Sequence, residues 1–126
     1  MQSIIYDWNR ITPEPTKTGH KRPFFRTPTS TLELLTCHVT TLNPGEAPHE
    51  PHRHPEEEMI ILKEGTLDAL HDGRTQPMSP GSVLLIASND LHGVRNAGDV
   101  LCDQMVHAGA VTSAIANPSY PLTPTV

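Results

Sequence analysis

Apolar and β-branched residues recur along the chain in short stretches, and nearly every stretch is followed by a Gly, Pro, Asn or Asp. Such stretches favour strands, and the residues after them favour turns. Strands are therefore expected at a spacing of about ten residues, over residues 31–42, 59–63, 66–71, 74–78, 82–87, 92–96 and 100–108. No window shows sustained apolar spacing at helical period. The pattern predicts an all-β sandwich or barrel.

Two stretches make this prediction more specific. Asp72-Gly73 lies between two expected strands and is the strongest short hairpin signal in the chain. Residues 83–87, with the sequence VLLIA, are all apolar. A short run of this kind is typical of a strand that is buried on both faces.

The two ends of the chain differ in composition from its middle. Residues 1–28 contain four of the thirteen prolines, and each proline removes a ladder donor, so this segment is expected to be an extended N-terminal arm rather than a central strand. The Phe24-Phe25 pair is expected to mark where the arm docks. Residues 117–126 contain three prolines and are expected to be a flexible tail, which leaves residues 29–116 for the barrel.

Length and charge exclude several classes of protein. At 126 residues and 13.8 kDa, the chain is long enough for one domain with a real core and too short for two. A net charge of −5 with nine Lys and Arg residues would repel a phosphate backbone, so nucleic acid is not an expected partner. The longest apolar run has five residues, against roughly twenty for a membrane span. With no secretion signal visible at the start, we expect a soluble, cytoplasmic protein without a membrane partner.

The two cysteines suggest no redox or metal role. Cys37 and Cys102 lie on separate expected strands, and neither belongs to a Cys-x-x-Cys pair. Free, buried thiols are expected.

Potential metal ligands crowd into one segment just before the strand expected at residues 59–63. His49, His52, His54 and Glu58 fall within ten residues. Imidazole nitrogens and carboxylate oxygens bind Zn, Fe, Mn, Ni and Cu ions. On a strand, side chains two residues apart share a face, so His52, His54 and Glu58 can point toward one ion. One such histidine alone would be an ordinary loop residue, but the group indicates a metal site.

The spacing of these residues resembles the first signature motif of the cupin superfamily. His52-x-His54 is followed after three residues by Glu58 and after six more by Gly65. The second motif of the family runs Gly, five residues, Pro-x-Gly, two residues, His, three residues, Asn. Gly81, His92 and Asn96 stand at the matching positions. Together the two motifs cover residues 45–96.

The chain departs from the family pattern at two places. Ala87 and Asn89 stand where the family usually has Pro and Gly, and six residues rather than five separate Gly45 from His52. Asn tolerates a positive φ nearly as Gly does, so the turn before His92 is expected to survive. The extra residue lengthens a loop and leaves the ligand spacing unchanged.

The resemblance implies a small RmlC-like jelly roll, a double-stranded β-helix, that brings His52, His54, Glu58 and His92 to one divalent transition metal. Three neutral imidazoles and one carboxylate would leave two positions of an octahedron for water or substrate. Mn, Fe, Ni, Cu and Zn all accept such ligands, so the identity of the metal stays open.

The function that the resemblance implies is a metal-dependent enzyme that acts on a small oxygen-rich molecule by Lewis-acid or dioxygen chemistry. The first alternative is a non-catalytic ligand-binding or sensing cupin, although the chain shows no helix-turn-helix or basic face of a complete regulator. A structural or storage role would not require an open ligand set. Small cupins commonly pair, so a homodimer is expected.

Three further histidines are weaker candidates for catalysis. His49 is expected to be mainly solvated, with a place at the pocket mouth or beside a ligand as the alternatives. His38 and His107 lie on expected strands whose inward face the sequence does not decide. An inward histidine would suit proton transfer. Glu56 and Glu57, beside Glu58, are expected to be solvated.

Overall fold

The computed structural model describes residues 2–98 and the strand backbone of residues 102–111. It contains no α-helix in these residues. The elements are a 3-10 turn, η1 (Trp8–Arg10), and the strands β1 (Glu14–Thr16), β2 (Gly19–Thr27), β3 (Leu34–Leu42), β4 (Glu58–Glu64), β5 (Leu67–His71), β6 (Arg74–Met78), β7 (Val83–Ile86), β8 (Gly93–Asn96) and β9 (Cys102–Val111). Each of the seven strands expected from the pattern is present, within a few residues of its expected ends.

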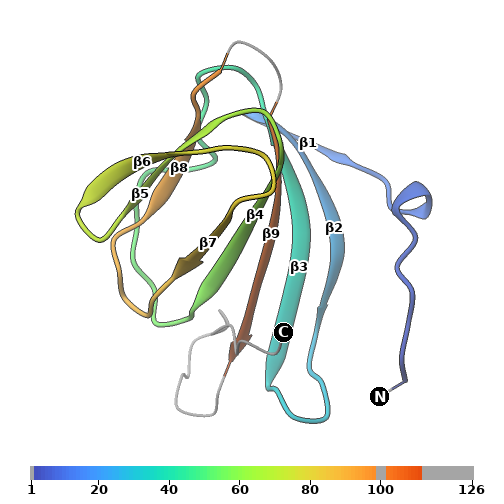
Figure 1. The fold of residues 1–126 in the computed structure, drawn as a ribbon. Helices are drawn as coiled ribbons and strands as arrows, with labels where there is room; N and C mark the ends of the chain where they lie inside the picture. Colours follow the sequence, from blue (N-terminus) through green and yellow to red (C-terminus); the bar gives the residue numbers. More distant parts are fainter. Residues whose placement is uncertain (1, 99–101, 112–126) are drawn as a thin grey trace.

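The described strands form two antiparallel sheets that face each other (Figure 1). The six-stranded sheet has the order β1-β2-β3-β9-β4-β7, and the three-stranded sheet has the order β6-β5-β8. Strand β9, the last of the described strands, lies between β3 and β4 and pairs with both of these earlier strands. The fold is the predicted all-β jelly-roll barrel.

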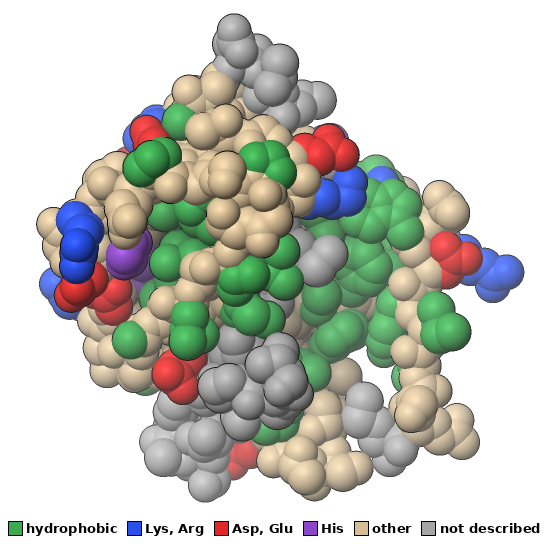
Figure 2. Space-filling model, in the orientation of Figure 1, with side chains coloured by type: hydrophobic (Ala, Val, Ile, Leu, Met, Phe, Trp, Pro, Cys, Tyr) green, Lys and Arg blue, Asp and Glu red, His purple; other side chains and the backbone are tan. Residues whose placement is uncertain are grey.

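The core lies between the two sheets and is built from alternate residues of the strands. Ile60 and Leu62 of β4 are buried, as are Leu67 and Ala69 of β5, at the period of two that a strand facing one core requires. Hydrophobic side chains gather in the middle of the molecule (Figure 2). Ile60, Leu62, Leu67 and Ala69 belong to one buried cluster, which also contains Leu42, Met78, Leu84, Ile86 and Val94. Burial of a Leu or Ile side chain contributes about 1.5–3 kcal/mol, so this cluster is a main source of stability.

The expectation that residues 83–87 are buried on both faces is wrong. In β7, Leu84 and Ile86 point into the core, but Val83 and Leu85 are each 56% exposed. The reason is that successive side chains of a strand point to opposite faces, and only the inner face of β7 packs on the described core.

Part of the segment expected to be an arm belongs to the sheet. Strands β1 and β2 pair with each other, and β2 pairs along its length with β3. Pro23 is accommodated because the β2–β3 register shifts between Pro23 and Phe25, where a bulge removes the need for a ladder donor. The residues before β1 do dock on the phenylalanine pair. The Tyr6 ring lies 5.0 Å from Phe25 and the Trp8 ring 5.9 Å from Phe24.

Two turns adopt the backbone that the sequence predicts. Asp72 and Gly73 both have positive φ, 48° and 73°, as a type I′ hairpin between β5 and β6 requires. Asn89, at the position where the cupin motif has Gly, has a φ of 62°. The substitution therefore preserves the turn before His92. The expected tail, residues 117–126, lies outside the described residues. Within the described part, no helix is long and apolar enough to cross a membrane.

Candidate metal centre

A backbone bridge brings the two halves of the ligand set together. His52 and His92 pair as an isolated antiparallel bridge, in which each main-chain N–H donates to the other's carbonyl at 3.0 Å. Glu58 is the first residue of β4 and shares the inward face of Ile60 and Leu62. His54 lies on the loop between the bridge and β4. The ligands therefore do not share one regular strand, as their spacing suggested, but a bridge, a loop and a strand end place them together.

The four side chains converge on one point. One ligand atom from each of His52, His54, Glu58 and His92 lies within 4.8 Å of all the others. The two Nε2 atoms of His52 and His92 are 3.1 Å apart. Glu58 Oε1 lies 3.0 Å from His54 Nε2 and 3.3 Å from His92 Nε2.

The hydrogen bonds of Nδ1 set the tautomers of His54 and His92, and so the state of the Nε2 atoms that face the other ligands. The Nδ1–H of His54 donates to the main-chain carbonyl of Glu56, and the Nδ1–H of His92 donates to that of Asp90, both at 2.8 Å. Because a carbonyl can only accept, Nδ1 carries the proton in each ring, and the neutral ring presents the Nε2 lone pair. Lone pairs and a carboxylate that converge in this way can be satisfied by a cation between them. The site therefore fits a divalent transition metal.

Electrostatics keep Glu58 ionised and His52 neutral. Burial by itself raises the pKa of Glu58, but the hydrogen bonds from His54 and His92 outweigh it and hold that pKa well below its usual range. Burial, and then the neighbouring histidines, lower the pKa of His52 to about 4. The hydrogen bond to Glu58 raises the pKa of His54, so a proton shared with Glu58 competes with a metal for this ring.

Asn96, the last residue of the second motif, has a structural role here. Its side chain is buried, donates to the carbonyl of Leu42 at 2.9 Å and accepts from the N–H of Gly98 at 2.9 Å. Its main chain pairs with Gly45 and Glu46. Asn96 thus ties the end of β3 and the start of the ligand loop to β8, the strand that directly follows His92.

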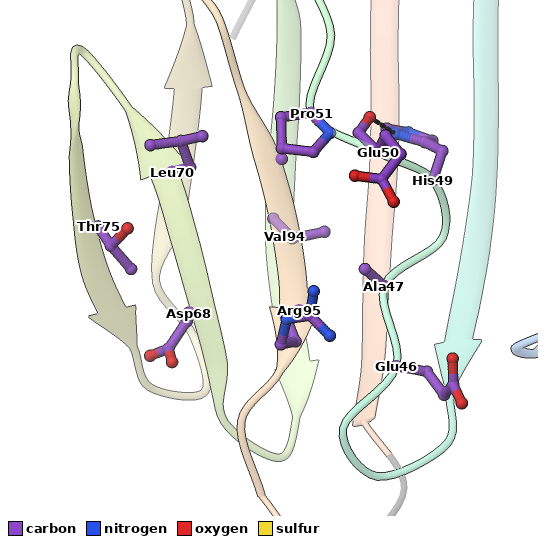
Figure 3. A pocket seen from close by; sticks show the side chains of 11 residues that line it. Glu46, Ala47, His49, Glu50, Pro51, Asp68, Leu70, Thr75, Val94 and Arg95 are labelled. Atoms are coloured by element: carbon purple, nitrogen blue, oxygen red, sulfur yellow. Dashed lines mark hydrogen bonds between the residues drawn. The ribbon is translucent and has the colours of Figure 1, made fainter.

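The structure places two of the three weaker candidates. The exposed His49 stacks on His52 with ring centroids 4.0 Å apart. It also lines, with Pro51, Asp68 and Arg95, a pocket of about 510 Å³ beside β5 and β8 (Figure 3). His38 lies in register with Val106, which lies in register with Ile60, so His38 shares the inward face of the six-stranded sheet. Burial, and then the charge of Lys21, lower its pKa to about 4 against the effect of Glu58.

The third candidate is described only by its backbone. His107 pairs with Cys37 and Met59, and its side chain lies outside the described residues. Cys37 is a free, half-buried thiol whose pKa is raised by burial.

Glu56 is the residue near the site that the sequence interpretation missed. It was expected to be solvated, but it is 1% exposed. The run of three glutamates contained no signal that one member is buried, because that burial depends on how the ligand loop folds back toward the barrel.

Comparison with known proteins agrees with this fold. The family profile described as the cupin domain matches residues 38–106. The chain belongs to the cupin superfamily. No match to this cupin was found among curated proteins.

Several solved structures share the fold of this cupin. A predicted oxalate decarboxylase from Thermotoga maritima is 19% identical with a TM-score of 0.64, over 82% of this chain and 96% of that one. The polyketide cyclase RemF from Streptomyces resistomycificus is 20% identical with a TM-score of 0.64, over 84% and 77%. An RmlC-like cupin from Shewanella frigidimarina is 16% identical with a TM-score of 0.65, over 85% and 93%. At these identities the likeness shows the fold alone.

Proposed function

We propose that this cupin is a metal-dependent enzyme that acts on a small oxygen-rich substrate at an ion held by His52, His54, Glu58 and His92. The observation that carries the proposal is the convergence of four ligand atoms within 4.8 Å, with the tautomers of His54 and His92 set by main-chain carbonyls. Four ligand atoms of the types that transition metals prefer, gathered at one point, suit a bound ion.

The residues of the chain supply position and environment. A bound ion would act as a Lewis acid on a substrate oxygen or, if it is iron or nickel, engage dioxygen. Glu58 neutralises part of its charge, and the backbone bridge of His52 and His92 fixes two ligands on a rigid element. The apolar wall formed by Ile60 and Ile86 limits access of water from the core side.

His38 is the best described candidate for holding a proton near a substrate. It lies on the inward face, and the charge of Glu58 acts on its ring. With its pKa lowered to about 4, the ring is neutral near pH 7 and can accept a proton. His49, stacked on His52 at the outer side, is the second candidate, and His107 is the third.

The names of fold relatives support the class of substrate rather than its identity. One relative is described as a predicted oxalate decarboxylase and another as a polyketide cyclase. Small molecules with carboxylate or carbonyl oxygens suit a site that holds a hard or borderline metal ion. The same barrel hosts many chemistries, so the reaction has to be found by assay.

Metal analysis of protein purified without chelator tests the proposal. Wild type is expected to hold close to one transition metal per chain, and His52→Ala and His92→Ala are expected to lose it. His71→Ala is the control, because His71 pairs with Gln76 on the β5–β6 hairpin. A wild type that neither retains nor binds Mn, Fe, Ni, Cu or Zn would refute the site.

Assays on the metal-loaded protein distinguish an enzyme from a sensor. Turnover or oxygen uptake with small carboxylates or phenolics supports the enzyme. Tight binding of such a molecule without turnover in a broad screen supports the ligand-binding alternative.

We further propose that this cupin forms a homodimer through the outer face of β4 and β7. The support is an apolar patch there: Leu85 lies in register with Met59 and Val83 with Ile61, and both β7 side chains are more than half exposed. Sedimentation of wild type and Leu85→Lys tests this. The variant is expected to be monomeric, whereas a monomeric wild type would rule the dimer out.

A further inference from the structure

Glu56 is a carboxylate buried beside the metal centre without an ordinary partner. The residue is 1% exposed, and neither of its carboxylate oxygens has a hydrogen-bond partner in the structure. A buried charge without a partner is costly, and proteins keep one only where something compensates it. The compensating charge must therefore come from a group that Glu56 faces.

His54 is the group that Glu56 faces. Glu56 Oε1 lies 3.5 Å from Nδ1 of His54, and that same Nδ1–H donates to the main-chain carbonyl of Glu56 at 2.8 Å. On its opposite edge, Nε2 of His54 lies 3.0 Å from Glu58. The imidazole of His54 thus stands between two carboxylates, one inside the ligand set and one behind it.

His92, whose Nδ1–H is also held by a main-chain carbonyl, lacks this second carboxylate. Nδ1–H of His92 also donates to a main-chain carbonyl, that of Asp90, but the Asp90 carboxylate accepts from the N–H of Asp72 instead. The arrangement behind His54 is therefore particular to that ligand. Together with three neutral imidazoles, Glu58 and Glu56 supply two negative charges, which equals the charge of one divalent ion.

We propose that Glu56 is a positioning residue of the metal centre: its main-chain carbonyl holds the His54 ring with Nε2 toward the ion, and its buried carboxylate, 3.5 Å from Nδ1 of that ring, completes the charge balance of a divalent metal. The inference rests on the proposed metal function. Carboxylates behind a metal-ligating histidine fix its orientation and raise its basicity, and their removal commonly weakens metal binding 10- to 100-fold.

This role predicts opposite effects in the two forms of the protein. Glu56→Gln keeps the shape of the side chain and removes its charge. Without metal, the variant is expected to melt at or above the wild-type temperature, because an uncompensated buried charge is gone. With metal, it is expected to gain less in melting temperature than wild type. A purely structural residue would lower both melting temperatures together.

The experiment compares chelator-stripped wild type, Glu56→Gln, Glu56→Asp and the control Glu57→Gln, which makes the same charge change at the neighbouring, less buried residue. Each protein is titrated with Mn²⁺ and with Co²⁺, whose visible spectrum reports ligand geometry, and is melted with and without metal. We expect Kd to rise 10- to 100-fold for Glu56→Gln and less for Glu56→Asp. Glu57→Gln is expected to stay within twofold of wild type.

Three results overturn the inference. The first is Glu56→Gln binding within twofold of wild type, and the second is an equal fall of both melting temperatures. The third is a failure of both Glu56 variants to fold, which would make the residue structural. Failure of the wild type to bind either metal is a separate result, since it refutes the metal centre itself.

Discussion

Replacing Asn96 with alanine tests whether the last residue of the second motif supports the barrel or serves the metal directly. The change removes a donor to the carbonyl of Leu42 and an acceptor for the N–H of Gly98, each at 2.9 Å. Asn96 is 1% exposed and Leu42 is fully buried, so water cannot replace the lost bond to Leu42 without opening the barrel end.

The expected cost follows from those two bonds. A buried polar group left unsatisfied costs about 1–3 kcal/mol, and the part-buried Gly98 N–H belongs at the low end of that range. The free energy of unfolding should therefore fall by about 2–4 kcal/mol. At roughly 4 °C per kcal/mol for a domain of this size, Tm falls by about 8–16 °C.

Urea unfolding and calorimetry measure this loss, with metal content determined on the protein that remains folded. Asn9→Ala is the control, because Asn9 is exposed beside η1, and it is expected to change stability by less than about 0.5 kcal/mol. If Asn96→Ala left stability unchanged but lost the metal, the reasoning would be refuted, because Asn96 would then act on the metal centre and not on the fold.

Two other predictions concern the core and the dependence of stability on pH. Leu62 is a core residue that is 1% exposed, so Leu62→Ala should lower the free energy of unfolding, measured in urea, by about 2–5 kcal/mol. Val83→Ala, on the exposed face of β7, should lower it by less than about 1 kcal/mol. Equal losses for the two variants would contradict the assignment of Leu62 to the core and Val83 to the surface. His38 has its pKa lowered from 6.5 to about 4 in the folded state, so the unfolded chain binds the proton first and stability is lost as pH falls from about 6.5 to 4, by up to about 3 kcal/mol. His38→Gln should flatten the stability curve over that window, and a variant with the wild-type slope would show that His38 is not responsible.

Local patterns were enough to predict the strands and the ligands. The extents expected for β4, β5 and β6 agree closely with the structure, and β6 agrees residue for residue, because hydrophobic alternation and turn residues act over neighbouring positions. The hairpin at Asp72-Gly73 and the positive φ of Asn89 were predictable for the same reason. The ligand set was predictable because its spacing matches two motifs, although His92 lies 40 residues from His52.

Which face of an element is buried was decided only by the tertiary structure. Val83 and Leu85 are exposed because only the inner face of β7 packs on the described core, and Pro23 sits in a strand because a bulge against β3 receives it. Both facts depend on which strands lie side by side, and pairing between distant segments leaves no local mark. Glu56 shows the same limit most clearly. It is followed by two more glutamates, yet the fold of the ligand loop buries Glu56 more deeply than either of them, behind a histidine of the candidate metal centre. The sequence by itself determined the strands and the candidate ligand residues, and the packing of distant segments decided their surroundings.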